Sequence, residues 1–302
     1  MTYEHTALEN DSILSCLLEH SASSRGEYIM VLFRGYFDES YSDESPRLMA
    51  IAGYVLEKDA ALSMDELWRR KLADEELSMF HMTDCANGFG EFDGMSFDRR
   101  DQIARHFIGL VRGYVSAGFA FISNQSQFDE SSIDKHGSPY AHGVKFCIGS
   151  LNAWVSCHGS ASKVSLVLES GHADQGLADR MAFSPQNRNS VDRVVTRSFA
   201  DKREAPLLQA ADILAWQSMK NLRDHINKSR PFRKDYLALT DKKHNIIYCA
   251  LSPNEMNLMF SDPGLNERRG EERRKREVME FMDLLSDETT PADIADFVRK
   301  RS

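Results

Sequence analysis

The stretch YIMVLFRGYFDES, residues 28–40, places an apolar run directly before two acids, Asp38 and Glu39. A short apolar run bounded by turn residues predicts a buried strand, here one with carboxylates at its C-terminal tip. Hard divalent cations take carboxylate oxygens as ligands, so an acidic strand tip is a common way to build a metal site.

Two later segments repeat this arrangement. The segment KVSLVLE, residues 163–169, is a predicted strand that ends at Glu169, and PLLQAAD, residues 206–212, is the start of a predicted helix that reaches Asp212. A carboxylate buried without a partner is costly. Three carboxylates on three apolar elements therefore predict one shared site.

The pattern of apolar runs predicts the order of the elements. A turn-rich stretch at 40–46 joins the first two strands and predicts a hairpin. Strands are predicted at 28–38, 47–56, 117–123, 163–169 and 191–199, and helices at 59–76, 98–116, 140–158 and 206–224. Alternation of this kind predicts an α/β fold in which helices flank a mixed β-sheet.

The chain divides into three parts by composition. Residues 1–27 are polar and are predicted to form an N-terminal appendage, and residues 28–225 hold the predicted α/β domain. Residues 226–302 are predicted to be a mostly helical C-terminal extension, with a short strand at 246–249 and helices at 253–260 and 265–285.

The amino-acid composition indicates a globular protein without a membrane-spanning segment. The chain has 302 residues, of which 42% are hydrophobic and 27% charged, which is ordinary for a globular protein with a real core. The sequence contains no apolar run of the roughly 18–20 residues that span a bilayer. Its five cysteines are scattered, and its start lacks a secretory pattern, so a cytoplasmic protein without a membrane partner is expected. The net charge of −9 argues against a broad basic face but leaves a local basic groove open.

Asp38, Glu169 and Asp212 have the chemistry of a Mg²⁺ or Mn²⁺ site. Two such ions about 3.5–4 Å apart can activate a water and stabilise the leaving oxygen in phosphodiester cleavage. Alternative interpretations are a surface acid at Glu169 and a polar boundary position at Asp212. Glu39 depends on where the first strand ends, because adjacent side chains on a strand point to opposite faces. It is a fourth catalytic acid if a turn follows Asp38, and otherwise a surface residue.

Three further residues are candidates for binding substrate. His81 precedes Asp84 in the sequence FHMTD and suits a base, a metal ligand or a phosphate contact, although a histidine beside an aromatic is often structural. Gln209 lies three residues before Asp212 on the same helix face and suits binding substrate or orienting a carboxylate. Lys202 lies just upstream and suits a phosphate contact. The glycine-rich nucleotide loops and the common hydrolase motifs are absent from the sequence.

Four pieces of the sequence, taken in order, resemble the domain-of-unknown-function 3800 (DUF3800) family. They are FDES at 37–40, FH at 80–81, LE at 168–169 and LQAADILA at 208–215. The resemblance covers roughly residues 29–222, and the last piece is its most specific part. It implies an RNase H-like fold in which Asp38, Glu169 and Asp212 match the family's acidic positions, and it implies a metal-dependent nuclease.

The sequence therefore predicts a metal-dependent nuclease or phosphodiesterase that acts on DNA or RNA with Mg²⁺ or Mn²⁺. Two alternatives stay open. One is a non-catalytic RNase H-like module that binds nucleic acid or protein, and the other is an enzyme that acts on small phosphorylated substrates. The sequence is also compatible with a homo-oligomer.

Overall fold

The structure is a computed structural model that describes residues 31–42, 47–124, 138–159, 161–185, 191–226, 233–240 and 245–250. The predicted N-terminal appendage and the helices expected at 253–260 and 265–285 lie outside these ranges. The division of the chain at residues 27 and 225 stays a prediction.

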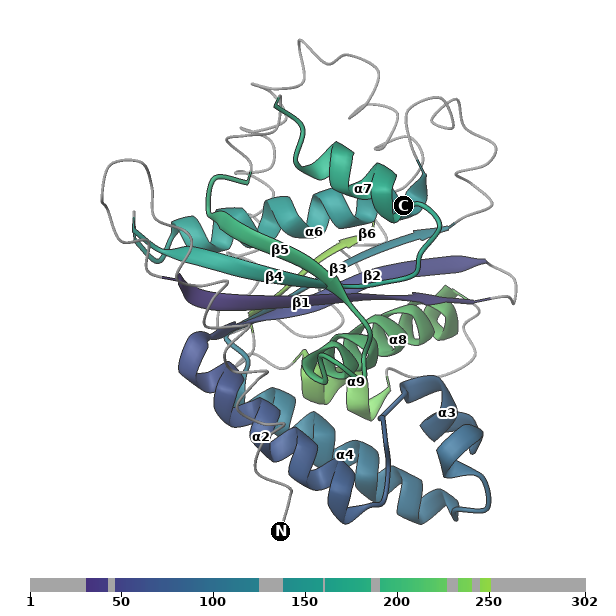
Figure 1. The fold of residues 1–302 in the computed structure, drawn as a ribbon. Coiled ribbons are helices and arrows are strands. Elements are labelled where there is room, and N and C mark those ends of the chain that lie inside the picture. Colours follow the sequence, from purple (N-terminus) through teal and green to yellow (C-terminus); the bar gives the residue numbers. More distant parts are fainter. Residues whose placement is uncertain are drawn as a thin grey trace, which may run out of the picture.

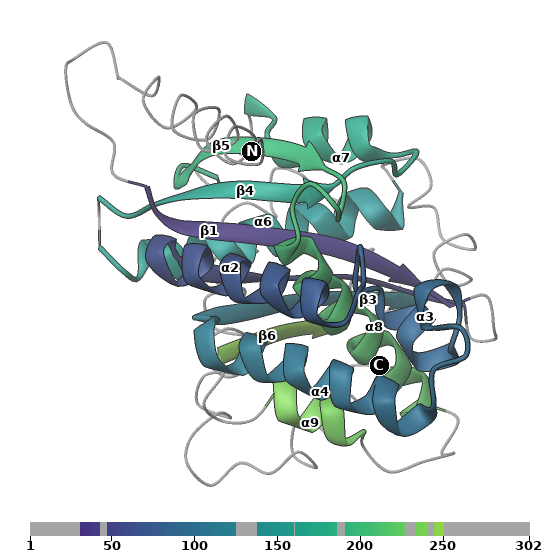
Figure 2. The same ribbon diagram turned by 60° about the horizontal axis from the view of Figure 1, so that its bottom comes forward.

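A six-stranded mixed sheet forms the centre of the molecule, with the strand order β5-β4-β1-β2-β3-β6 (Figure 2). The strands are β1 Val31–Tyr41, β2 Leu48–Glu57, β3 Ala117–Asn124, β4 Lys163–Glu169, β5 Val194–Ala200 and β6 Asn245–Ala250. Antiparallel pairing joins β1 to β2 and β2 to β3, so the predicted hairpin is confirmed. Parallel pairing joins β1 to β4, β4 to β5 and β3 to β6.

Helices cover both faces of this sheet (Figure 1). One face carries α2 Lys58–Asp74, α3 Met82–Asn87, α4 Phe97–Tyr114, α8 Leu207–Ile226 and α9 Lys234–Leu239. The other face carries α6 Pro139–Ser156 and α7 Gln175–Ala182. The predicted α/β class, with a mixed sheet flanked by helices, is confirmed. The short helices α3 and α9 and the 3₁₀ turn η1, Gly90–Phe92, were not predicted.

Two hydrophobic clusters fill the space on the two sides of the sheet. Trp68, Phe80 and Phe107 belong to the cluster on the side of the sheet that carries α2, α4 and α8, and Phe37 and Phe119 belong to the cluster on the α6 side. All five side chains are at most 2% exposed. These large buried aromatics fix how α2, α4 and α6 pack against the strands.

The alternation of side chains along β1 sets which face each acid occupies. Tyr36 belongs to the cluster on the α8 side and Phe37 to the cluster on the α6 side. Asp38 has the parity of Tyr36 and Glu39 that of Phe37, so their side chains start toward opposite faces. Asp38 and Glu169 lie at the same end of the sheet, because β1 and β4 are parallel neighbours.

None of the helices within the described ranges is both long enough and apolar enough to cross a membrane.

A candidate metal centre that contains a buried lysine

Asp38 lies at the carboxyl end of β1, beside Glu169 at the end of β4. In the register of the two strands, Phe37 pairs with Leu168, which places the two acids one residue further on in each strand. Asp38 is 2% exposed and Glu169 is partly buried. Burial raises the pKa of Asp38 well above its usual range, and a shared hydrogen bond with the Glu169 carboxyl adds to the rise. The two acids thus form a pair that favours a proton or a cation between them.

Asp212 reaches the same place from the second turn of α8, and it is 2% exposed. Its Oδ2 accepts a hydrogen bond of 2.7 Å from the backbone N–H of Met82, the first residue of α3. Its Oδ1 lies 3.8 Å from Nε2 of His81. The short helix α3, which the sequence did not predict, therefore fixes the orientation of one predicted acid.

Lys202 lies among the three predicted acids. Its Nζ is 2.9 Å from Asp38 Oδ2, 3.1 Å from Glu169 Oε2 and 3.4 Å from Asp212 Oδ1. Burial by itself lowers the pKa of Lys202, but the charges of the three carboxylates outweigh it and raise the pKa above the usual range. The structure thus brings the three predicted metal ligands together around the ammonium group of Lys202. This cluster of acids around Lys202, which Glu39 also joins, is named here the acidic group.

Glu39 also joins this group. The strand β1 continues to Tyr41, so no turn separates Glu39 from Asp38. Even so, Asp38, Glu39 and Glu169 each offer one oxygen, and these oxygens lie within 4.8 Å of one another. Burial raises the pKa of Glu39 to about 7, and the Glu169 charge adds to the rise. This tight set contains Glu39 in place of Asp212, the third ligand that the sequence predicted.

Gln209 is buried in the core and holds three parts of the chain in place. Its Oε1 accepts hydrogen bonds from the indole N–H of Trp68 at 2.8 Å and from the backbone N–H of Phe80 at 2.9 Å. Its Nε2 donates to the carbonyl of Lys202 at 2.9 Å. Gln209 is 0% exposed, so it does not meet substrate directly, and its partners are an indole N–H, a backbone N–H and a carbonyl in place of the carboxylate that it was predicted to orient.

His81 lies at the edge of the acidic group. Its Nδ1 is 3.0 Å from Asp84 Oδ2, and its Nε2 points toward Asp212. The side chains of His81 and Asp84 are about one third exposed, at 32% and 33%. A carboxylate that is hydrogen-bonded to one ring nitrogen fixes the direction in which the other ring nitrogen points. This arrangement occurs at many sites that bind metal or transfer protons.

The donor chemistry of the group fits a divalent cation. The tight set consists only of carboxylate oxygens, which Mg²⁺ and Mn²⁺ prefer. Asp38 Oδ2 is buried and forms an ion pair with the Lys202 ammonium at 2.9 Å, and among the described residues it accepts no further hydrogen bond. Four carboxyl groups, those of Asp38, Glu39, Glu169 and Asp212, lie around one lysine, and the raised pKa values of Asp38 and Glu39 mean that a proton or a cation is favoured there.

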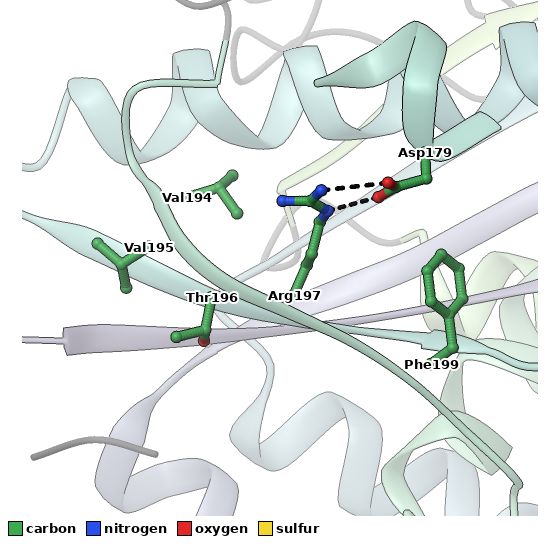
Figure 3. Close-up of a pocket in the computed structure, with 6 residues that line it drawn as sticks. All are labelled: Asp179, Val194, Val195, Thr196, Arg197 and Phe199. Carbon is green, nitrogen blue, oxygen red and sulfur yellow. Dashed lines mark hydrogen bonds and ion pairs between the residues drawn. The ribbon is translucent and has the colours of Figure 1, made fainter. Parts of the chain in front are cut away.

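A shallow hollow of about 420 Å³ lies elsewhere, between β5 and α7 (Figure 3). It is lined by Asp179, Val194, Val195, Thr196, Arg197 and Phe199. Arg197 reaches from β5 toward Asp179 and donates to both carboxylate oxygens, one of them at 3.1 Å. None of the predicted site residues lines this hollow, and its only acid is already paired with Arg197. The acidic group at the ends of β1 and β4 is therefore the better candidate site.

No protein-family model matches this chain, and no curated protein sequence is significantly similar to it. The case for a function therefore rests on the chemistry of the acidic group.

Proposed function

We propose that the protein is a metal-dependent nuclease of RNase H-like fold, related to the DUF3800 family, that cleaves phosphodiester bonds in nucleic acid. The observation that carries the proposal is the convergence of Asp38, Glu39 and Glu169 within 4.8 Å at one end of the sheet. The strand order β5-β4-β1-β2-β3, with β2 antiparallel to its neighbours, supports the RNase H-like part.

Asp38, Glu39 and Glu169 would hold a Mg²⁺ or Mn²⁺ ion. When bound, such an ion polarises a phosphoryl oxygen and lowers the pKa of a coordinated water. Burial raises the pKa of Asp38, and the positive charge of Lys202 opposes that rise. A lysine ammonium is also a compact charge suited to a phosphate oxygen.

His81 supplies a proton-transfer group at the rim of this site. The Asp84 carboxylate, 3.0 Å from Nδ1, fixes the ring so that Nε2 faces the acidic group. A histidine held in this way can accept a proton from an attacking water or donate one to a leaving oxygen.

Lys202 also favours a second candidate function. A single buried ammonium already neutralises part of the charge on Asp38, Glu169 and Asp212, so the acids are held together without a metal. The same fold would then be a non-catalytic module that binds nucleic acid or protein.

Metal titration together with cleavage assays separates the two functions. Purified protein is titrated with Mn²⁺ by calorimetry and incubated with labelled single- and double-stranded DNA and RNA. We expect saturable Mn²⁺ binding that weakens roughly tenfold or more in Asp38→Asn, and cleavage that falls at least about a hundredfold in the same variant.

Asp179→Asn is the matched control, because it removes a carboxylate that lies outside the acidic group. It should bind Mn²⁺ and cleave as the wild type does. Absence of saturable Mn²⁺ binding, or equal cleavage by wild type and Asp38→Asn, would refute the nuclease and leave the binding module.

A further inference from the structure

Three aromatic rings follow the acids at the carboxyl end of the sheet. Tyr41 is the last residue of β1, two residues after Glu39. His172 comes three residues after Glu169, and Tyr140 lies in the first turn of α6. Both strands that carry the acidic group therefore lead directly into this aromatic group, named here the Tyr41–His172–Tyr140 stack.

The rings of the stack are almost parallel. The ring centroids of Tyr140 and His172 are 3.6 Å apart with an angle of 6° between the planes. Those of Tyr41 and His172 are 6.0 Å apart with an angle of 12°. Parallel rings at these spacings form a stacking surface, and a further planar ring can extend it.

His172 takes part in the stack as a neutral ring. Its Nδ1 accepts a hydrogen bond of 2.9 Å from the backbone N–H of Asp174. Burial lowers the pKa of His172, although the nearby Asp174 charge opposes this. An uncharged imidazole that is parallel to two phenol rings gives the stack flat, neutral ring faces.

The stack has a buried end and an exposed end. Tyr140 is 3% exposed, whereas Tyr41 is 41% exposed. Residues i and i+2 on a strand share a face and lie about 7 Å apart, so the exposed ring of Tyr41 and the carboxylate of Glu39 are close neighbours. A ligand at this end of the sheet would meet acids and an exposed ring together.

We propose that the Tyr41–His172–Tyr140 stack binds an unpaired nucleobase of the strand whose phosphate lies at the acidic group. This inference rests on the proposed function for its substrate class. A ligand with a planar ring and a phosphodiester a short distance away fits both features at once. In a duplex both faces of a base are covered by its neighbours, so only a single-stranded or flipped base offers a face to Tyr41.

Binding of short labelled oligonucleotides tests the proposal, with Ca²⁺ in place of Mn²⁺ and fluorescence anisotropy as the readout. Removing a base–aromatic stack by alanine substitution weakens single-strand binding by about 5- to 150-fold. We expect a loss of this size for Tyr41→Ala on single strands and near wild-type binding for Tyr41→Phe, which keeps the ring. An oligonucleotide of abasic nucleotides should bind wild type and Tyr41→Ala equally.

His158→Ala is the matched control for His172→Ala. His158 also packs against two aromatic rings, tilted against Trp154 and edge-on to Phe33, but Phe33 lies toward the opposite end of β1 from the acids. The His158→Ala variant should bind single strands as wild type does, and His172→Ala should bind them more weakly.

The possible failures are distinguishable. If wild type cleaves and binds single strands but Tyr41→Ala binds them equally well, the stacking subsite is refuted and the nuclease stands. If wild type prefers duplex over single strands and Tyr41→Ala binds that duplex equally well, the unpaired base is refuted in the same way. If wild type neither binds nor cleaves any nucleic acid, both proposals fail together.

Discussion

Two sets of ion pairs between a basic side chain and carboxylates show how burial changes the energetic effect of an ion pair. Lys202 contacts Asp38, Glu169 and Asp212 with a side chain that is 9% exposed. Arg197 contacts Asp179 beside the shallow hollow with a side chain that is 42% exposed. The acids around Lys202 include carboxyls with strongly raised pKa values, whereas the Arg197 pair is a surface ion pair. The comparison predicts that substitutions in the first group have large effects and substitutions in the second have small ones.

The largest effect is expected for Lys202→Met. Removing one partner of a buried ion pair leaves uncompensated charge in a region of low dielectric, which costs about 3–5 kcal/mol of unfolding free energy. Urea denaturation at pH 7 without divalent metal measures this loss. Added Mn²⁺ should restore part of it, because a ligand that binds only the folded state stabilises that state.

Lys163→Met is the control for this prediction. Lys163 is a lysine at the start of β4 whose Nζ donates a hydrogen bond of 2.9 Å to the carbonyl of Asp192. Its loss should change the unfolding free energy by no more than about 1 kcal/mol. Equal losses for the two variants would mean that Lys202 is not the charge partner on which the acidic group depends.

The pH dependence of stability is the next largest effect. Glu39 titrates near 4.5 in the unfolded chain and near 7 in the folded one, so the folded state binds more protons between these values. The unfolding free energy therefore falls as pH rises from about 4.5 to 7, by at most about 3 kcal/mol for this group. The contribution is fully present below pH 4.5 and lost above 7.

Glu39→Gln isolates this group. Glutamine keeps the shape of the side chain and cannot ionise, so the metal-free variant should have a flatter stability profile across the same pH range. The measurement is urea denaturation at half-unit pH steps in the presence of a chelator. Parallel profiles for wild type and Glu39→Gln would show that Glu39 does not titrate in the acidic group.

The main strands of the sheet and the long helices that flank it could be predicted because apolar residues recur at regular spacing in each. The run at 28–40 became β1, and the run at 163–169 became β4 with the predicted limits. The elements that were missed are short: α3 and α9 have six residues each and η1 has three. Fewer than two helical turns show no amphipathic period, yet α3 supplies the N–H that holds Asp212.

The acids of the candidate site could be predicted from the sequence, but the position of Lys202 among them could not. Asp38, Glu169 and Asp212 could be found because each interrupts or ends an apolar element. The position of Lys202 depends on the turn between β5 and α8 folding back over the end of β1, which no local pattern specifies. Glu39 was uncertain because alternation separates adjacent side chains on a strand, whereas its oxygen approaches those of Asp38 and Glu169 at the end of the sheet.

The smallest effect is expected at the exposed pair. Asp179→Asn removes the carboxylate charge but keeps a side chain of similar shape, and Arg197 keeps its place 4.2 Å above the ring of Phe183. Exposed ion pairs contribute about 0–1 kcal/mol, and this contribution falls as salt screens the charges. Urea denaturation in low salt and in high salt should show a small loss that disappears in high salt. The loss of unfolding free energy could instead be as large as that of Lys202→Met, or salt could leave it unchanged. In either case the exposed pair would behave as a buried one, and burial would not explain the difference between the two ion pairs.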